Sequence, residues 1–249
     1  MGFFQKGGEK VYFDIHSHIL PGIDDGAKDI TESAELINFM KKEGITEVIA
    51  TPHFYPNEMS LGDFLEHRNN AYETLCSNLD GDIPRIYIGC EILYFKRMGA
   101  SRELEELSLN NSKYILLELS DVHIDKYLFE DFALFAENGI VPIIAHIERY
   151  HKSRNFKKLL EEIKCRNYPV QINSSSLLQK KYRRAIKKVC KSGLFCVIAT
   201  DTHSLQKRPP VIKSAFEVLK KDFGEEIYNN VISNNRILYN EIIGDSVDK

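Results

Sequence analysis

The sequence lacks any apolar stretch long enough to cross a membrane. Its longest such run covers residues 139–145, whereas a transmembrane helix needs about 20 apolar residues. No signal peptide is visible, because Phe3 and Phe4 are followed by the polar segment Gln-Lys-Gly-Gly-Glu-Lys, where a signal peptide has an apolar core. We therefore expect a protein that is not inserted in a membrane.

The sequence also lacks a cysteine pattern typical of disulfides or zinc sites, and it has no net positive charge. The 249 residues include five cysteines and no CxxC pair, and an odd number without such a pair argues against a disulfide framework or a thiolate zinc site. A reducing, cytoplasmic setting fits this pattern. The formal net charge of −3 argues against a nucleic-acid partner, which a strongly basic surface would attract.

The chain instead alternates short apolar runs with helical patterns. The runs are bounded by turn or polar residues, as buried strands are, and they cover residues 11–15, 47–50, 86–90, 114–119, 141–145, 170–172 and 195–199. Segments with helical spacing, such as 31–42 and 179–191, lie between them. This alternation predicts an α/β fold with a parallel sheet closed into one barrel. Because seven strands are found and not eight, either one strand is hidden or the barrel is irregular.

Histidines gather at the ends of these runs. Five of them lie at or just after the C-terminal end of a predicted strand: His16, His18, His53, His146 and His203. In a parallel barrel these ends share one rim, where active sites lie. His16 and His18 are two residues apart, so both face the same side of a strand and could bind one metal ion. Taken singly, each could be an ordinary polar histidine. The other three are expected to be surface or structural: His67, His123 and His151.

Carboxylates accompany these histidines. Glu91 follows the third run and Glu118 lies in the otherwise apolar fourth, where a carboxylate needs a cation because it is almost never buried unpaired. Asp201 stands two residues before His203. Of Asp24 and Asp25, one is expected to form a turn or cap, and the other is within chain reach of His16 and His18.

Together these positions supply nitrogen and oxygen ligands at six strand ends: His16, His18, Asp25, His53, Glu91, Glu118, His146, Asp201 and His203. The set exceeds what one ion needs, so two or three ions are implied. Imidazole and carboxylate ligands without thiolate suit Mn²⁺, Zn²⁺ or Fe²⁺, and such a rim can clamp phosphoryl oxygens. Arg149 and Arg208 lie beside these segments. They could recognise phosphate or be ordinary surface arginines.

These motifs resemble those of the polymerase-and-histidinol-phosphatase (PHP) proteins. The longer strings at 14–26, 145–150, 171–175 and 208–210 are similar to the CpsB/YwqE-like protein-tyrosine phosphatases of bacterial capsule and exopolysaccharide systems. The resemblance covers residues 11–240 and implies the PHP fold, a distorted TIM-like (β/α)7 barrel. We expect one phosphatase domain over residues 11–249, preceded by an N-terminal extension of residues 1–10. Residues 119–126, which do not align, are expected to shape the substrate mouth.

The resemblance also implies a trinuclear metal site. His16, His18, Glu91 and Asp201 would hold one ion, Glu91, Glu118 and His146 a second, and Asp25, His53 and His203 a third. Glu91 would bridge the first two. Arg149 and Arg208 match the phosphate-binding arginines of the family. Manganese is the first candidate metal, with iron or zinc as alternatives.

The implied activity is hydrolysis of phosphotyrosine, with the tyrosine-rich tail of a bacterial tyrosine autokinase that controls polysaccharide export as the implied substrate. Cysteine-dependent tyrosine phosphatases need an arginine six positions after the cysteine. No cysteine here has one, so phosphatase activity has to come from metals. Two alternatives remain: a histidinol-phosphatase-like enzyme acting on small molecules, and a non-catalytic module that docks on the kinase. An open mouth would favour a protein substrate.

The segment 179–191 has a basic face opposite its apolar stripe, formed by Lys180, Lys181, Arg184, Lys187, Lys188 and Lys191. The ordinary interpretation is a solvated face. The alternative is that it attracts an acidic kinase tail or anionic lipid. Because this helix follows the sixth strand, its C-terminal end is expected to point away from the rim.

Overall fold

The structure, a computed structural model, describes residues 4–6, 9–120 and 124–244. Its first half contains strands β1 (Phe4–Lys6), β2 (Glu9–Ser17), β3 (Ile45–Ala50), β4 (His53–Phe54), β5 (Arg85–Ile88), β6 (Glu91–Leu93) and β7 (Tyr114–Glu118). The helices of this half are α1 (Ile30–Lys42), α2 (Leu61–Asn78) and the short turns η1 (Met98–Ala100), η2 (Arg102–Leu107) and η3 (Leu109–Asn111).

The second half is a series of βα units. Its strands are β8 (Val141–Ile144), β9 (Val170–Asn173) and β10 (Cys196–Ala199). Its helical elements are α3 (Lys126–Glu137), η5 (Ile147–Lys152), α4 (Phe156–Arg166), α5 (Ser174–Leu178), α6 (Lys180–Lys191), α7 (Ile212–Val218), η6 (Leu219–Phe223) and α8 (Glu225–Ile243). Among the described residues, no helix is both long and apolar enough to cross a membrane.

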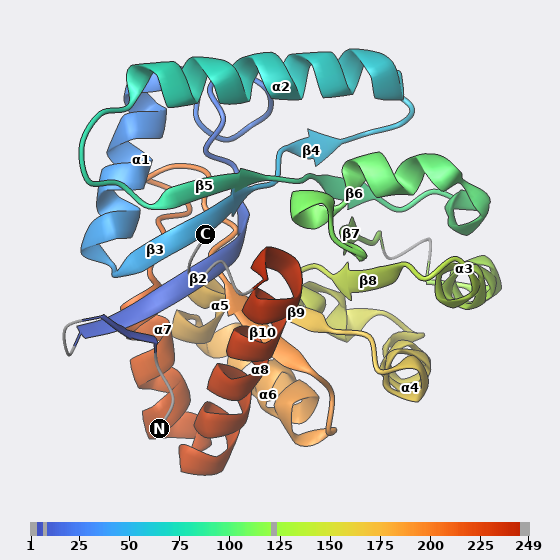
Figure 1. The fold of residues 1–249 in the computed structure, drawn as a ribbon. Helices are drawn as coiled ribbons and strands as arrows, with labels where there is room; N and C mark the ends of the chain where they lie inside the picture. Colours follow the sequence, from blue (N-terminus) through green and yellow to red (C-terminus); the bar gives the residue numbers. More distant parts are fainter. Residues whose placement is uncertain (1–3, 7–8, 121–123, 245–249) are drawn as a thin grey trace.

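The strands form one irregular parallel barrel (Figure 1). Two sheets are hydrogen-bonded, in the orders β1-β2-β3-β5 and β10-β9-β8-β7-β6-β4. They are two parts of one ring, because β4 continues β3 after Pro52 and β6 continues β5 after Cys90. The Gly89 amide donates to Ala50 O at 2.9 Å, and the Glu91 amide donates to Pro52 O at 3.1 Å. The prediction of seven strand units is therefore confirmed, with two of the units interrupted.

The ring closes beside the first strand. The amide of Asp201, just after β10, donates to His16 O at 2.9 Å, and the His18 amide donates to Thr202 O at 2.9 Å. At the other end of β2, β1 adds an antiparallel hairpin with Phe4 opposite Val11. Strand β2 therefore begins at Glu9, inside the segment expected to be an extension. The seven predicted runs otherwise match β2, β3, β5, β7, β8, β9 and β10 to within two residues at each end.

Glu91 lies in a strand of its own, where the sequence predicted the end of a longer one. The interruption falls at Gly89, which packs against η3. A Cβ at Gly89 would lie 2.7 Å from a methyl carbon of Leu109 and 3.2 Å from its Cα. A residue with a side chain does not fit there, and the strand is interrupted at this point: β5 ends at Ile88 and β6 begins at Glu91.

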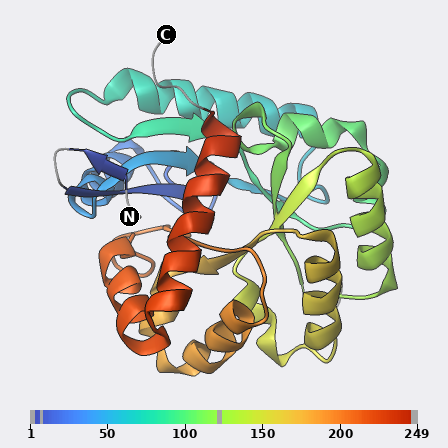
Figure 2. The ribbon, with the colours of Figure 1, turned by 60° about the horizontal axis from the view of Figure 1, so that its bottom comes forward.

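Apolar side chains fill the barrel below the rim. One buried cluster is shared by strands on opposite sides of the ring and includes Phe13, Ile49, Leu116, Ile143 and Val197. Leu238 and Ile242 of α8 also belong to it, and Asn235 of α8 accepts a hydrogen bond from the Ile198 amide at 3.0 Å. Figure 2 shows α8 running between the N-terminal strands and the later βα units. The helix holds the first and last strands together.

Candidate metal centre

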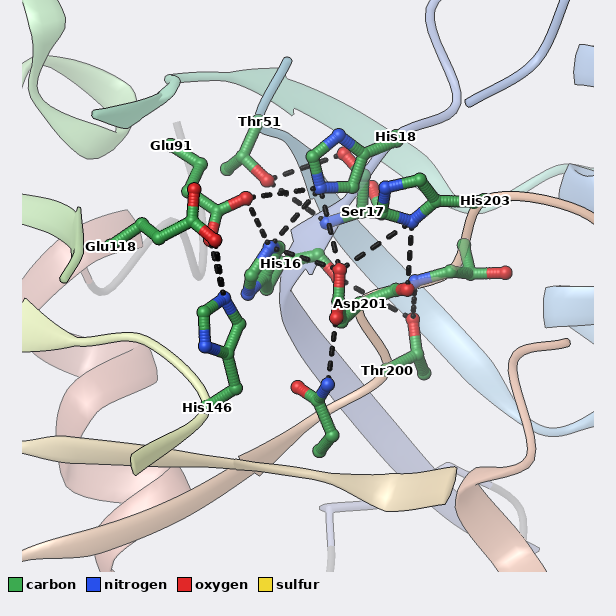
Figure 3. A network of polar contacts seen from close by, with 12 residues as sticks. His16, Ser17, His18, Thr51, Glu91, Glu118, His146, Thr200, Asp201 and His203 are labelled. Carbon is green, nitrogen blue, oxygen red and sulfur yellow. Dashed lines mark hydrogen bonds and ion pairs between the residues drawn. The ribbon is translucent and has the colours of Figure 1, made fainter. Parts of the chain in front are cut away.

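His16 and His18 meet at the end of β2, as their spacing predicted. Their Nε2 atoms are 3.1 Å apart (Figure 3). On the other side of each ring, His16 Nδ1 donates to Gln171 Oε1 at 3.2 Å and His18 Nδ1 donates to Asp24 Oδ2 at 2.7 Å. Because Nδ1 is the donor in both contacts, the Nε2 atoms of the two rings face the same place and can bind a metal ion when the rings are neutral. This is the arrangement of metal-binding histidines.

The two aspartates of the next loop have different partners. Asp24 orients His18 and also accepts from the His53 amide at 3.0 Å. Asp25 instead lies 3.1 Å from His203 Nε2 and 3.4 Å from His53 Nε2. Gly26 lets this loop approach the strand, since a Cβ there would lie 2.2 Å from His18 O. Asp24 is thus the structural member of the pair and Asp25 the one that faces the histidine cluster.

The carboxylates of β6 and β7 face His146. Glu91 is fully buried, and its Oε1 lies 2.8 Å from His146 Nε2. Glu118 Oε1 lies 3.5 Å from the same nitrogen. The other oxygen of Glu91 lies 3.2 Å from His16 Nε2 and 3.1 Å from His53 Nδ1. Glu91 therefore stands between the two halves of the cluster, as expected of a bridging ligand.

Asp201 and His203 complete the cluster from the segment after β10. Asp201 Oδ1 lies 3.4 Å from His16 Nε2 and 3.5 Å from His18 Nε2. His203 Nδ1 donates to Asp201 O at 3.0 Å, which again leaves Nε2 facing the cluster. Asp201 has φ 52° and His146 has φ 33°, in the left-handed region that non-glycine residues rarely adopt. Such strain costs about 1–3 kcal/mol per residue and is concentrated at functional sites.

All nine predicted residues therefore come together at one rim. Their ligand atoms form three groups, each with all its atoms within 4.8 Å of one another: His18, Asp25, His53 and His203; His16, His18, Glu91 and Asp201; and His53, Glu91 and Glu118. The second group is the predicted first set. In the third, His53 takes the place expected for His146, which lies next to the same two carboxylates.

The chemistry of the donor set fits divalent cations. His53 Nδ1, Glu91 Oε2 and His203 Nε2 are buried and have no hydrogen-bond partner among the described residues, and an unpaired buried polar atom is costly. Burial and the charge of Glu91 raise the pKa of Glu118 to about 7. Cations between these groups would satisfy the orphaned atoms and keep the carboxylates ionised.

The two predicted arginines lie at the edge of the cluster. Arg149 Nη2 donates to Asp201 Oδ2. Arg208 donates from Nη1 to Asp201 Oδ1 at 3.3 Å and from Nη2 to Asp25 Oδ2 at 3.1 Å. Their side chains remain 34% and 30% exposed. Both guanidinium groups can therefore meet an anion that approaches the rim from solvent.

Two of the remaining three histidines lie apart from this cluster. His67 is exposed on α2, and His151 contacts Glu148 O through Nδ1 at 2.8 Å. Both are surface or structural residues, as predicted. His123 and neighbouring residues of the unaligned segment lie outside the described residues.

Sequence reasoning missed several residues that hold the ligands in place. Gln171 accepts from His16 Nδ1 and from the His146 amide at 2.7 Å, and Asn173 donates to Asp201 Oδ2 at 2.7 Å. Tyr150 contacts His146 Nδ1 through its hydroxyl at 3.2 Å. A signal for the first two was present, because Gln171 and Asn173 are two residues apart at the end of an otherwise apolar strand.

Comparisons with known proteins agree with this geometry. The family model "Capsular polysaccharide synthesis, CpsB/CapC" matches residues 12–239. Tyrosine-protein phosphatase YwqE of Bacillus subtilis is 32% identical over 232 residues, which cover 90% of each chain. Tyrosine-protein phosphatase CpsB of Streptococcus agalactiae is 30% identical over 231 residues, 89% of this chain and 95% of the relative.

A solved structure gives the same result in three dimensions. It comes from work on YwqE of Bacillus subtilis and CpsB of Streptococcus pneumoniae, which are described as unique metal-dependent tyrosine phosphatases. It superposes with a TM-score of 0.78 at 27% identity and covers 95% of this chain and 96% of the other. The likeness therefore extends over the whole barrel.

Proposed function

The chain belongs to the CpsB/CapC family of capsular polysaccharide synthesis, and from that premise we propose that it is a metal-dependent protein-tyrosine phosphatase. The observation that carries the proposal is the convergence of the Nε2 atoms of His16, His18 and His203 on carboxylates beside two partly exposed arginines. We propose that residues 11–249 belong to a single catalytic domain, to which β1 and the first residues of β2 are joined.

The metal ligands are the nine residues of the rim: His16, His18, Asp25, His53, Glu91, Glu118, His146, Asp201 and His203. We propose three divalent ions, with Mn²⁺ as the first candidate and Fe²⁺ or Zn²⁺ as alternatives, because the donor set is imidazole and carboxylate. Ions held there supply Lewis acidity that activates water and polarises phosphoryl oxygens.

The chain's own residues bind and orient the phosphate. Arg149 and Arg208 hold its non-bridging oxygens, which planar guanidinium groups bind in pairs. Asp201 and Asp25 position the two guanidinium groups before substrate arrives. Gln171 and Asp24 fix the rings of His16 and His18, so that the ligand atoms keep their places when phosphate binds.

The rim is open enough for a protein substrate. Asp25 is 64% exposed, although it faces the histidine cluster, and an enclosed metabolite pocket would bury such a side chain. The proposed substrate is phosphotyrosine on a protein of capsule or exopolysaccharide synthesis, with the tail of a tyrosine autokinase as the first candidate.

Metal analysis combined with a choice of substrates tests this function. Gently purified protein should contain divalent metal, lose phosphatase activity with a chelator and regain it with Mn²⁺. It should release phosphate from phosphotyrosine peptides faster than from histidinol phosphate. Preference for histidinol phosphate would favour the small-molecule enzyme, and metal-loaded protein with no phosphatase activity would favour the docking module.

A further inference from the structure

Helix α6 carries an unusual concentration of positive charge. Its twelve residues, KKYRRAIKKVCK, include seven lysines or arginines and no acidic residue, while the whole chain has a net charge of −3. Six of them share the face opposite buried Ile186 and Val189, and we call this face the basic ridge: Lys180, Lys181, Arg184, Lys187, Lys188 and Lys191. All six side chains are exposed.

The basic ridge is unfavourable for the helix that carries it. Lys180 and Arg184, like Arg184 and Lys188, are four residues apart, and like charges at this spacing repel. Lys180 and Lys181 lie in the first turn, where the helix dipole disfavours cations, and Gln179 provides no side-chain cap. A face that is merely solvated usually mixes both signs of charge. This sequence breaks several local rules at once, and such conflicts are concentrated at functional surfaces.

Neighbouring acidic groups do not neutralise the ridge. Within the described part of the chain, α6 makes one ion pair, between Arg183 and Asp222 at 2.5 Å, and Arg183 lies beside the ridge. Lys187 donates to the backbone oxygen of Asp222 at 3.3 Å. Arg184 and Lys188 make no ion pair with the described residues. Their charge is available to an external anion.

The ridge begins beside the candidate metal centre. The turn η5 starts directly after His146 and contains Arg149, and two residues later the ring of His151 packs edge-on against Tyr182 of α6, with centroids 5.8 Å apart. The ammonium group of Lys181 lies over the Tyr182 ring, 4.7 Å from its centroid. Because α6 follows β9 and α5 in the chain, we expect the ridge to run along α6 away from the rim.

We propose that the basic ridge binds an acidic segment of the polypeptide whose phosphotyrosine occupies the metal centre. The inference rests on the proposed phosphatase function and adds a substrate class to it: phosphotyrosine flanked by acidic or further phosphorylated residues. A phosphotyrosine held by Arg149 places its flanking chain at η5. A substrate peptide that leaves the site over His151 then reaches Lys181 first.

The length of the ridge sets the position of the acidic residues. A helix of twelve residues spans about 18 Å, which an extended peptide covers with about five residues. Acidic side chains that follow the phosphotyrosine over about five residues of an extended chain would lie along the ridge. Acidic residues placed much farther away would not be favoured.

The test compares two phosphotyrosine peptides that differ only in four flanking residues, all Glu or all Gln, on metal-loaded full-length protein. The parent should show a higher kcat/KM on the Glu peptide at low salt. Arg184→Glu with Lys188→Glu should lower kcat/KM on the Glu peptide about 10-fold, and 0.5 M salt should reduce this loss to about two-fold. Hydrolysis of the Gln peptide and of a small aryl phosphate should not change.

A matched control reverses the same number of charges elsewhere. Lys41→Glu with Lys42→Glu alters two exposed lysines at the end of α1, just before β3 and therefore at the opposite end of the barrel from the rim. This variant should keep the parent's preference for the Glu peptide. If both variants lose it equally, net charge is the cause and the ridge proposal is overturned.

The other outcomes separate the ridge from the proposed function. A parent that hydrolyses both peptides equally well overturns the ridge proposal alone. A metal-loaded parent that hydrolyses neither peptide overturns the phosphatase function and the ridge proposal with it. If the ridge variant loses binding to phosphatidylserine vesicles but hydrolyses both peptides as the parent does, the ridge is a membrane contact and not a substrate site.

Discussion

Two side chains of strand β7 show how differently the apolar interior and the rim of the barrel are built. Leu116 and Glu118 are two residues apart and therefore face the same side of the sheet. Leu116 is fully buried among apolar side chains of other strands. Glu118 points to Glu91 and His146 at the rim, and burial together with the charge of Glu91 raises its pKa to about 7. The middle of the strand stabilises the fold, and its last residue brings a charge that needs a cation.

The difference has a thermodynamic consequence. Burying an apolar side chain contributes roughly 1.5–3 kcal/mol to stability, whereas burying a charge without a partner costs free energy. Substitutions below the rim should therefore change stability and leave the chemistry of the folded protein unchanged. Substitutions at the rim should do the reverse.

The largest expected effect is at the rim. His16→Ala should lower kcat/KM by ~10³-fold or more, because a metal ligand that supplies several kcal/mol of transition-state stabilisation is removed. The unfolding midpoint should barely change, since His16 lies among polar groups and outside the apolar clusters. Steady-state kinetics, metal analysis and thermal unfolding measure the three quantities. His67→Ala on the exposed face of α2 is the control and should be neutral. A His16→Ala enzyme with full activity and metal content would refute the site.

The next largest effect is expected in the apolar interior of the barrel. Leu116→Ala should lower the free energy of unfolding by ~2–5 kcal/mol, as truncations of buried leucines do, and the remaining folded protein should keep its metal content. Denaturant titration measures the loss. Leu178→Ala, at a side chain that is 38% exposed, should change stability by less than about 0.5 kcal/mol. Loss of metal at full stability in the Leu116 variant would show that the interior and the rim are not separable.

The interior and the rim also differ in how far the sequence predicted them. Ligands such as His16, His18 and Asp201 were identified because a charged or imidazole group at the end of an apolar strand is conspicuous, and βα alternation places such ends at one rim. The close approach of Gly89 to Leu109 could not be predicted, because the two residues are twenty positions apart in the chain. Local pattern carries no information about such packing.

The positioning residues lie between these extremes. Gln171 and Asn173 stand out by their spacing at the end of an apolar strand, but this spacing alone does not indicate which groups they contact. Their contacts with His16 and Asp201 join elements that are distant in sequence. Likewise, sequence could not decide which of Asp24 and Asp25 faces the cluster, because the answer depends on how the loop packs against His18.

A smaller effect at the rim tests this intermediate role. Gln171→Leu removes the acceptor of His16 Nδ1 and of the His146 amide but no metal ligand. Metal affinity or activity should fall 10–100-fold, as for other groups that orient metal ligands. Titration of metal-free protein with Mn²⁺, followed by activity, distinguishes weaker metal binding from slower turnover. Gln179→Leu, just before α6, is the matched control. A loss as large as that of His16→Ala would contradict a positioning role.

The smallest expected effect concerns the cysteines, which belong to neither the metal centre nor the basic ridge. Cys90 and Cys196 are buried, and Cys76 and Cys165 are exposed on the outer helices. Burial raises the pKa of Cys90, so its thiolate is scarce and it reacts slowly. Alkylation of the native enzyme should therefore modify Cys76 and Cys165 and leave kcat/KM within about two-fold. Replacing all five cysteines by Ser or Ala should also preserve the mechanism, although each buried site should cost ~1–3 kcal/mol of stability. Mass spectrometry identifies the modified residues, and the double variant Cys76→Ser with Cys165→Ser shows whether any loss follows from them. Complete inactivation of folded, metal-loaded protein by alkylation would mean that a thiol takes part in the reaction, and the assignment of catalysis to the metal rim would be wrong.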